Sequence, residues 1–444
     1  MKHLLFSTLL ASSLFSTSSP TAQAQSEKYI PTKENLAARQ DFSDSKFGIF
    51  LHWGLYSLFA QGEWYMQNEG INRDEYAKAM NAFYPHSFDA AKWVSAFKAA
   101  GAKYICFTTR HHEGFSMWDT KQSDYNIMHT PYGRDIVRQL ADECHKQGIG
   151  LHLYYSHIDW TRDDYPTRRT GKNTGKDPKK ENWDQYYAFM NAQLTELLTN
   201  YGRVDGIWFD GWWDHDEDKQ PFDWQLSDQY ALIHKLQPAC IIGNNHHQTP
   251  FDGEDMQMFE RDVPGENKSG LSGQDISKLP LETCQTMNGM WGYKVKDQNY
   301  KSTSDLLRLL VRSAAKGANL LINIGPQPDG NLPDAALERL AEMGTWLNSS
   351  KGESVYSTVA GPCALGDSVV TTCGRTSGTL YVHVMTTNAQ TSITLPLGRK
   401  VKQASSLSSG EKLTTRFDKK NGNVTFCIPD MKAGDIDYVI KVER

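Results

Sequence analysis

Two carboxylates close apolar runs in this chain of 444 residues. Asp210 ends the run 206–209 and is followed by Gly211 and two tryptophans, and Glu260 ends the run 256–259 in the same way. An unpaired charge is costly in an apolar strand, so each carboxylate is expected at a strand tip that faces a cleft. One ionised and one protonated carboxyl can cleave a glycosidic bond with retention. Asp210 suits the nucleophile, and apolar surroundings should raise the pKa of Glu260 towards that of a general acid.

Hydrogen-bonding side chains also lie at the ends of the other apolar runs. They are His52 and Trp53, His111 and His112, Tyr155 and His157, Asn244 to His247, and Glu282. Each of them alone is more often a structural residue. Together they suit a pocket that holds a small polyol.

Two other kinds of site stay open on these residues. A metal-dependent barrel hydrolase would need a second imidazole two residues after His52, and that position is Gly54. His111 and His112 are adjacent and would point to opposite faces of a strand. A barrel that binds a sugar without cleaving it would leave Asp210 and Glu260 without a role. We therefore expect no metal and no organic cofactor.

Short apolar runs alternate with helical patterns over most of the chain. The runs are 46–52, 104–109, 150–156, 206–210, 240–244, 256–260, 281–287 and 319–325. Asp89 can cap a helix over 90–100, and Ser302 can open another that ends at Gly317. This alternation predicts an α/β fold with a (β/α)₈-like TIM barrel, whose connections over 245–290 look irregular. An open doubly wound sheet is the alternative, but no glycine-rich dinucleotide motif supports it. Active sites of such barrels lie at the carboxyl ends of the strands.

The chain beyond about residue 352 has a different pattern. Short β-branched runs separated by Gly, Asn and Ser predict a C-terminal antiparallel β-sandwich over 352–444, behind a catalytic barrel over 25–351. The basic segment 162–180 reads as an exposed, solvated loop after the third strand.

Composition restricts the setting in which the protein works. Residues 1–24 resemble a secretory signal peptide, so we expect export, to the periplasm if the host is Gram-negative. The net charge of −5 gives no sign of a nucleic-acid partner, and no apolar run is long enough to span a membrane. The seven cysteines have no metal-type spacing, and most should be buried small hydrophobes.

Several longer motifs resemble one known family. GIFLHWGLYS (48–57), GEWY (62–65), RHHEGFSMWDT (110–120), IWFDGWW (207–213), ETCQTMNGMWGY (282–293) and KGANLLINIGPQPDGNLP (316–333) look like the α-L-fucosidases of glycoside hydrolase family 29. The motifs occur in order from about residue 30 to 350. The resemblance implies a retaining enzyme that releases terminal L-fucose from fucosylated glycans.

The resemblance also implies roles for individual residues. Asp210 matches the nucleophile. Positions that bind the fucose hydroxyls and ring match His52, Glu63, Trp64, His111, His112, Tyr155 and Trp208, and Trp291 falls where an aromatic residue packs on the C6 methyl. Glu260 is the closest match to the acid/base, with Glu282 as its rival and Glu254 or Asp255 as further candidates. The run 244–247 replaces an arginine-bearing stretch of some relatives.

Overall fold

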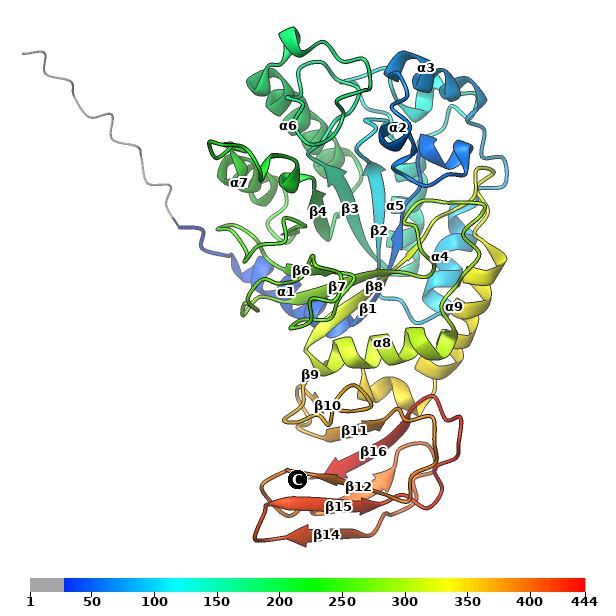
Figure 1. Cartoon of the computed structure of the whole chain (residues 1–444), viewed down its shortest axis with the longest axis vertical. Helices are drawn as coiled ribbons and strands as arrows, with labels where there is room; N and C mark the ends of the chain where they lie inside the picture. Colours follow the sequence, from blue (N-terminus) through cyan, green and yellow to red (C-terminus); the bar gives the residue numbers. More distant parts are fainter. Residues whose placement is uncertain (1–27, 444) are drawn as a thin grey trace, which may run out of the picture.

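The computed structural model describes residues 28–443, and the predicted signal peptide, residues 1–24, lies outside them. A parallel sheet wrapped by helices is followed by two antiparallel sheets, which lie below the barrel in Figure 1. The predicted fold class, a (β/α)₈-like barrel with a C-terminal antiparallel β-sandwich, is confirmed. The boundary placed at residue 351 stays a prediction.

Eight parallel strands form the barrel, and each overlaps one of the predicted apolar runs. They are β1 (Phe47–Leu51), β2 (Tyr104–Arg110), β3 (Gly150–Ser156), β4 (Gly206–Asp210), β5 (Ile241–Asn244), β6 (Gln257–Glu260), β7 (Leu281–Thr286) and β8 (Ala318–Ile324). Hydrogen-bonded neighbours follow the order β5-β4-β3-β2-β1-β8-β7-β6. Between β5 and β6 the amides of Asp255 and Met256 donate to the carbonyl of Ile242, at 2.7 and 3.2 Å. The barrel is therefore nearly closed, with its seam between β5 and β6.

Helices cover the outside of this barrel. The α-helices are α1 (Lys33–Ser45), α2 (Tyr65–Asn68), α3 (Arg73–Ala77), α4 (Ala90–Ala99), α5 (Ile136–Gln147), α6 (Trp183–Asn200), α7 (Leu226–Leu236), α8 (Thr303–Ala315) and α9 (Asp334–Leu347). Asp89 caps α4 by accepting from the Lys92 amide, and Ser302 caps α8 by accepting from the Asp305 amide, as predicted. Within residues 28–443 no helix separates β5, β6 and β7, and none of the helices there could cross a membrane.

Short 3₁₀ segments complete the helical elements. They are η1 (Leu55–Phe59), η2 (Lys78–Ala82), η3 (Ile127–His129), η4 (Pro178–Lys180), η5 (Trp212–His215) and η6 (Ser350–Ser354). Of these, η5 follows Asp210 directly after the turn at Gly211, so it begins at the carboxyl end of β4.

Large inward side chains fill the barrel because glycines on the neighbouring strands make room for them. A Cβ added to Gly48 would lie 2.4 Å from the Tyr104 ring, and one added to Gly206 would lie 2.5 Å from the His152 ring. Residues two apart on a strand share a face, so Gly206 puts Asp210 on the inward face as well. The nucleophile candidate therefore lies over the interior of the barrel.

The C-terminal part forms a five-stranded and a three-stranded antiparallel sheet. The strands are β9 (Thr358–Ala360), β10 (Val369–Gly374), β11 (Leu380–Val384), β12 (Ser392–Leu395), β13 (Gln403–Ser406), β14 (Thr415–Asp418), β15 (Asn423–Cys427) and β16 (Tyr438–Glu443). The short β-branched runs of this part, residues 369–372, 379–385, 392–397, 424–428 and 438–442, predicted β10, β11, β12, β15 and β16. They did not predict β9, which is very short, or β13 and β14, whose sequences are largely polar.

The basic segment 162–180 is packed at its centre rather than solvated. Tyr165 is fully buried, and the Lys176 ammonium donates to the carbonyl oxygens of Asp159 and Tyr165, at 3.0 and 2.8 Å. The interpretation as an exposed loop is wrong for this part, because backbone carbonyls satisfy the cation internally. The segment also carries Arg169 to the mouth of the cavity described next.

Candidate active site

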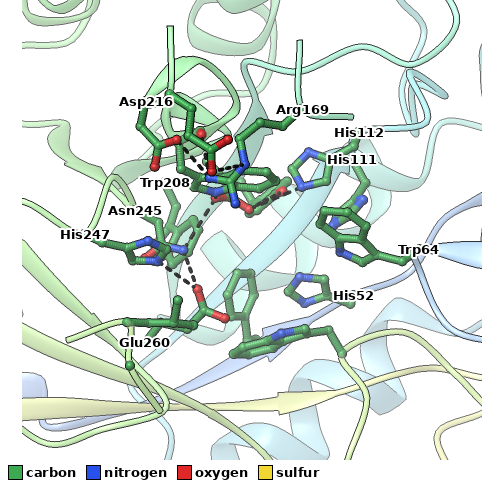
Figure 2. Close-up of a pocket in the computed structure, with 18 residues that line it drawn as sticks. His52, Trp64, His111, His112, Arg169, Trp208, Asp216, Asn245, His247 and Glu260 are labelled. Atoms are coloured by element: carbon green, nitrogen blue, oxygen red, sulfur yellow. Dashed lines mark hydrogen bonds and ion pairs between the residues drawn. The ribbon is translucent and has the colours of Figure 1, made fainter. Parts of the chain in front are cut away.

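A cavity of about 550 Å³ opens at the carboxyl ends of the barrel strands (Figure 2). Most of the predicted site residues line it, namely His52, Trp64, His111, His112, Trp208, Asp210, Glu260 and Trp291. Trp213, one of the two tryptophans after Gly211, lines it as well, and so do Asn245 and His247 of the predicted run 244–247. The lining residues that the sequence did not single out are Phe50, Tyr154, Arg169, Asp216, Glu217, Gly270 and Leu271.

Asp210 is held by donors on both of its carboxylate oxygens. Oδ1 accepts from the Gly211 amide at 2.8 Å and from Trp213 Nε1 at 3.0 Å, and Oδ2 accepts from the Tyr154 hydroxyl at 3.0 Å. Burial, reinforced by the charge of Glu260, nevertheless raises the pKa of Asp210 to about 6. The donors fix the direction of the carboxylate while its surroundings keep it weakly solvated.

Gly211 is required where the chain turns after β4. Its φ of 106° lies in a region that side-chain-bearing residues rarely adopt, and an added Cβ would lie 2.6 Å from Ile158. The turn brings the indole of Trp213 back onto Asp210. The local sequence Asp-Gly-Trp-Trp thus builds one wall of the site.

Glu260 ends β6 and faces Asp210 across the seam of the barrel. Its Oε2 accepts from Asn245 Nδ2 at 2.8 Å and lies 3.2 Å from His247 Nε2, and Arg261 Nε lies 3.9 Å from Oε1. Burial acts to raise the pKa of Glu260, but the hydrogen bond and charge of His247, with Asn245 and Arg261, hold it below its usual range. The expectation of a raised pKa at Glu260 is wrong because these polar neighbours outweigh burial.

One amide connects the two carboxylates. Asn245 Nδ2 lies 2.8 Å from Glu260 Oε2 and 3.5 Å from Asp210 Oδ1. These two oxygens therefore cannot be farther apart than the sum of the two distances. That upper limit is below the roughly 6.5 Å minimum between the carboxyl groups of inverting glycosidases.

Three neutral imidazoles line the other side of the cavity. His52 Nδ1 lies 2.7 Å from Asn323 Oδ1, and His112 Nδ1 lies 2.6 Å from Ser156 Oγ. Burial lowers the pKa of His52 and of His112 to about 3, and it also lowers the pKa of His111 well below its usual value. His111 and His112 both face the cavity. The expectation that adjacent histidines would point to opposite faces of a strand is wrong here, because the two follow the last residue of β2. Neutral rings of this kind can exchange hydrogen bonds with hydroxyl groups.

Aromatic rings form much of the remaining surface. Trp64 stacks on Trp213 with ring centroids 5.8 Å apart, and the Arg261 guanidinium lies 5.1 Å from the centre of the Trp291 ring. Trp208 is fixed from beneath, since its Nε1 donates to Glu282 Oε1 at 3.0 Å. Rigid apolar faces beside polar groups suit a ligand that has both, such as a deoxysugar.

Tyr155 does not line the cavity, and we correct its assignment to Tyr154. Adjacent strand residues point to opposite faces, and the Tyr155 hydroxyl donates to Gln193 Oε1 of α6 at 2.7 Å. Tyr154 points inward and reaches Asp210. The sequence match was displaced by one residue.

Glu63 also contributes no surface to the cavity. It is buried, and its Oε2 accepts from the Gly292 amide at 2.6 Å. The carboxylate therefore holds the turn that follows Trp291 against the segment that carries Trp64.

None of the rival acid/base residues lines the cavity. Glu282 accepts from Tyr104 and Trp208 inside the barrel, and burial raises its pKa to about 7. Glu254 is bound by His246 and Tyr230, and Asp255 is paired with Arg39 and His234. Among these candidates Glu260 alone reaches the same space as Asp210. Within residues 28–443 no cluster of His, Cys, Asp and Glu has the arrangement of a metal site.

The mouth of the cavity carries charged residues that sequence reasoning missed. Arg169 Nη1 donates to Asp216 Oδ1 at 2.9 Å and to the Trp213 carbonyl at 3.1 Å, and its Nε lies 3.6 Å from Glu217. Gly270 also lines the cavity. Arg169 lies in the loop after β3, and Gly270 lies in the loop after β6. The position of these loops at the carboxyl ends of barrel strands was the one feature of the sequence that could have indicated them.

The sequence matches the model of the family described as "Alpha-L-fucosidase" over residues 16–353. The chain is similar to the "Alpha-L-fucosidase" of Dictyostelium discoideum, with 28% identity over 462 residues that cover 95% of each chain.

Solved structures of α-L-fucosidases are similar to this chain as well. The fold is similar to that of α-L-fucosidase isoenzyme 1 from Paenibacillus thiaminolyticus, with a TM-score of 0.80, 32% identity, and coverage of 92% of this chain and 99% of that one. It is also similar to a family 29 α-L-fucosidase from Bacteroides thetaiotaomicron, with a TM-score of 0.80, 27% identity, and coverage of 94% and 99%. That structure is a covalent intermediate trapped with 2-fluoro-fucosyl fluoride, in a variant in which one glutamate is replaced by glutamine.

Proposed function

The chain belongs to the α-L-fucosidases of glycoside hydrolase family 29, and from this premise we propose that Asp210 and Glu260 cleave terminal L-fucose from fucosylated glycans with retention of configuration. The observation that carries the proposal is the pair of carboxylates held by the single amide of Asn245. The upper limit that these two contacts set on the distance between the oxygens is compatible with a nucleophile and an acid/base, and lies below the range in which a water molecule attacks from the opposite face.

In the first step Asp210 attacks C1 of the fucose through an oxocarbenium-like transition state. The C1–O bond to the leaving glycan breaks, and the proton of Glu260 moves to the departing oxygen. The product is a β-fucosyl ester on Asp210. The donors on the two Asp210 oxygens orient the carboxylate for this attack.

In the second step water attacks C1 and gives its proton to Glu260. The bond between C1 and Asp210 breaks, which regenerates both residues and releases α-L-fucose. The trapped covalent intermediate of the Bacteroides thetaiotaomicron relative supports a double displacement in this chain, because the two folds correspond over nearly their whole length.

The sugar itself would lie among the neutral imidazoles and the indoles. His52, His111 and His112 have the chemistry to bind fucose hydroxyls, and we assign Trp291 to the C6 methyl. Trp64 and Trp208 complete the aromatic surroundings of the ring. Tyr154 takes the place that the sequence gave to Tyr155, and Glu63 acts indirectly by holding the turn after Trp291.

The proposal is tested by digesting fucosylated oligosaccharides with α1,2, α1,3, α1,4 and α1,6 linkages and following the products by proton NMR. The sugar released first should be the α anomer of L-fucose, which then mutarotates. Initial release of the β anomer would contradict retention. The panel also identifies the linkage that the enzyme accepts.

We also propose that the protein is exported, on the strength of residues 1–24 alone. Their basic start, short apolar stretch and Ala22-Gln23-Ala24 are typical of a cleaved signal peptide. N-terminal sequencing of the protein recovered from its natural host should begin at Gln25. An N-terminus at Met1 would contradict the proposal.

A further inference from the structure

His247 has an unusual backbone conformation for a residue with a side chain. It follows β5 with a φ of 59°, in the left-handed region that histidine visits only occasionally. Such conformations are retained where the surrounding structure requires them, and functional sites are a common place for them. Here the conformation places the imidazole beside Glu260, across the seam from β5 to β6.

Two donors converge on a single oxygen of Glu260. Figure 2 shows the contacts of Asn245 and His247 meeting at the same carboxylate oxygen, which is Oε2, at 2.8 and 3.2 Å. The amide nitrogen of Asn245 can only donate, so Oε2 accepts that bond. An ionised Glu260 has no hydrogen to offer, so His247 donates from Nε2.

The other oxygen of Glu260 is in a different situation. Within residues 28–443 Oε1 has no hydrogen-bond partner, and Arg261 Nε lies 3.9 Å away. A proton on Oε2 would have to displace one of the two donors. A proton on Oε1 displaces neither and leaves both donors bound to the carbonyl-like Oε2.

We propose that His247 is a positioning residue that, together with Asn245, keeps Oε2 as an acceptor and so assigns the transferable proton to Oε1 of Glu260. The inference rests on the proposed role of Glu260 as the acid/base. In the first step the proton leaves Oε1 for the glycosidic oxygen, and in the second step water returns a proton to Oε1. His247 and Asn245 stay bound to Oε2 throughout.

Several titratable or charged groups surround the Glu260 carboxyl besides His247. They are Asp210, Arg261, His52, Glu63 and Cys284. None of them donates a hydrogen bond to Oε2 in the described part of the chain. The hydrogen bond from His247 lowers the pKa of Glu260, so its loss should raise that pKa.

The test uses two variants of the full-length enzyme. In His247→Gln the amide nitrogen is the same number of bonds from Cβ as Nε2, so the donor is kept, whereas His247→Phe keeps a ring and removes the donor. kcat/KM is measured for the best-cleaved oligosaccharide and for 2-chloro-4-nitrophenyl α-L-fucoside, whose leaving group needs little protonation. Thermal unfolding of both variants shows whether folding is intact.

We expect His247→Phe to lower kcat/KM for the oligosaccharide by about tenfold or more and that for the aryl fucoside by less than about threefold. The alkaline limb of the pH profile of kcat/KM should move to higher pH in His247→Phe. His247→Gln should stay close to the wild type in its kcat/KM for both substrates and in its pH profile. A higher pKa makes the protonated acid easier to populate, so a purely electrostatic role predicts no loss on the oligosaccharide. A lower kcat/KM of His247→Phe for the oligosaccharide would therefore show that the proton is no longer held on Oε1 of Glu260.

Three results would overturn this inference. They are an equal loss on both substrates, a glutamine variant that behaves like the phenylalanine variant, and an oligosaccharide rate that is unchanged or raised in His247→Phe. Glu260→Gln is measured beside them. If Glu260→Gln still cleaves the oligosaccharide at the wild-type rate, the proposed function itself fails. If Glu260→Gln is inactive on it and His247→Phe is not impaired, only the role of His247 is rejected.

Discussion

The hydroxyl of Tyr154 donates a hydrogen bond of 3.0 Å to Oδ2 of Asp210. The two side chains come from neighbouring strands, β3 and β4, and both point to the inside of the barrel. The hydroxyl of the adjacent Tyr155 points the other way and is bound to Gln193 of α6. Two chemically identical residues thus differ only in the face of the strand from which they project.

This difference gives a matched pair of variants. Tyr154→Phe removes a hydrogen bond to Asp210, the proposed nucleophile, and should lower kcat/KM by about tenfold or more, because bonds to charged groups contribute about 1.5–3 kcal/mol. Tyr155→Phe should leave kcat/KM within about threefold and should lower the unfolding temperature, because Gln193 loses its buried partner. Steady-state kinetics and thermal melts check both. A loss of kcat/KM in Tyr155→Phe but not in Tyr154→Phe would show that Tyr155, rather than Tyr154, belongs to the active site.

The acid/base assignment predicts a dependence on the leaving group. Glu260→Ala should lower kcat/KM for a natural oligosaccharide by about a hundredfold or more and affect an activated aryl fucoside far less, because the aryl leaving group needs little protonation. Glu282→Gln is the control, since Glu282 lies beneath the cavity and binds Trp208. It should change both substrates by the same factor. A selective loss on the oligosaccharide in Glu282→Gln would make Glu282 the acid.

The pair of carboxylates predicts an acidic optimum. The proposed mechanism requires one proton on the pair, with Asp210 ionised and Glu260 protonated, and coupled groups titrate together. Burial and the charge of Glu260 raise the pKa of Asp210 to about 6, while the donors hold that of Glu260 below its usual range. We expect kcat/KM to fall about tenfold per pH unit above pH 6, where the pair loses its proton, and to fall again in acid, where both groups are protonated. A kcat/KM that stays constant up to pH 8 would contradict this.

The barrel strands could be predicted because parallel strands that are covered on both faces consist of continuous apolar runs. The strands that the sequence did not reveal lie in the C-terminal sheets. They are β9, which is very short, and β13 and β14, which are largely polar and half exposed to solvent. Their pairing depends on partners far along the chain, which local pattern does not contain.

The direction of individual side chains was harder to predict, although a signal existed. Gly206 lies on the inward face of β4, because a Cβ added there would meet the His152 ring, and Gly150, two residues before His152, lies on the inward face of β3. Counting in steps of two from Gly206 reaches Asp210, and counting from Gly150 reaches Tyr154 rather than Tyr155. The spacing of the glycines could therefore have corrected the tyrosine assignment.

The chemical environment of Glu260 could not be read from the sequence near it. The apolar run before it suggested a raised pKa, but the groups that lower it come largely from the end of β5, across the seam of the barrel. Arg169 reached the cavity mouth from a loop that looked solvated, because its partners Asp216 and Glu217 follow a different strand. Such contacts exist only once the strands are in place.

The proposed role of Asp210 as the nucleophile is tested by adding azide to Asp210→Gly. The variant should lose kcat by on the order of 10⁴-fold or more, because no carboxylate remains to form the covalent intermediate. With an activated aryl fucoside, azide should occupy the vacated space, restore turnover and yield β-L-fucosyl azide, identified by NMR. Substantial activity of Asp210→Gly without azide, or an azide adduct of the α configuration, would contradict the account.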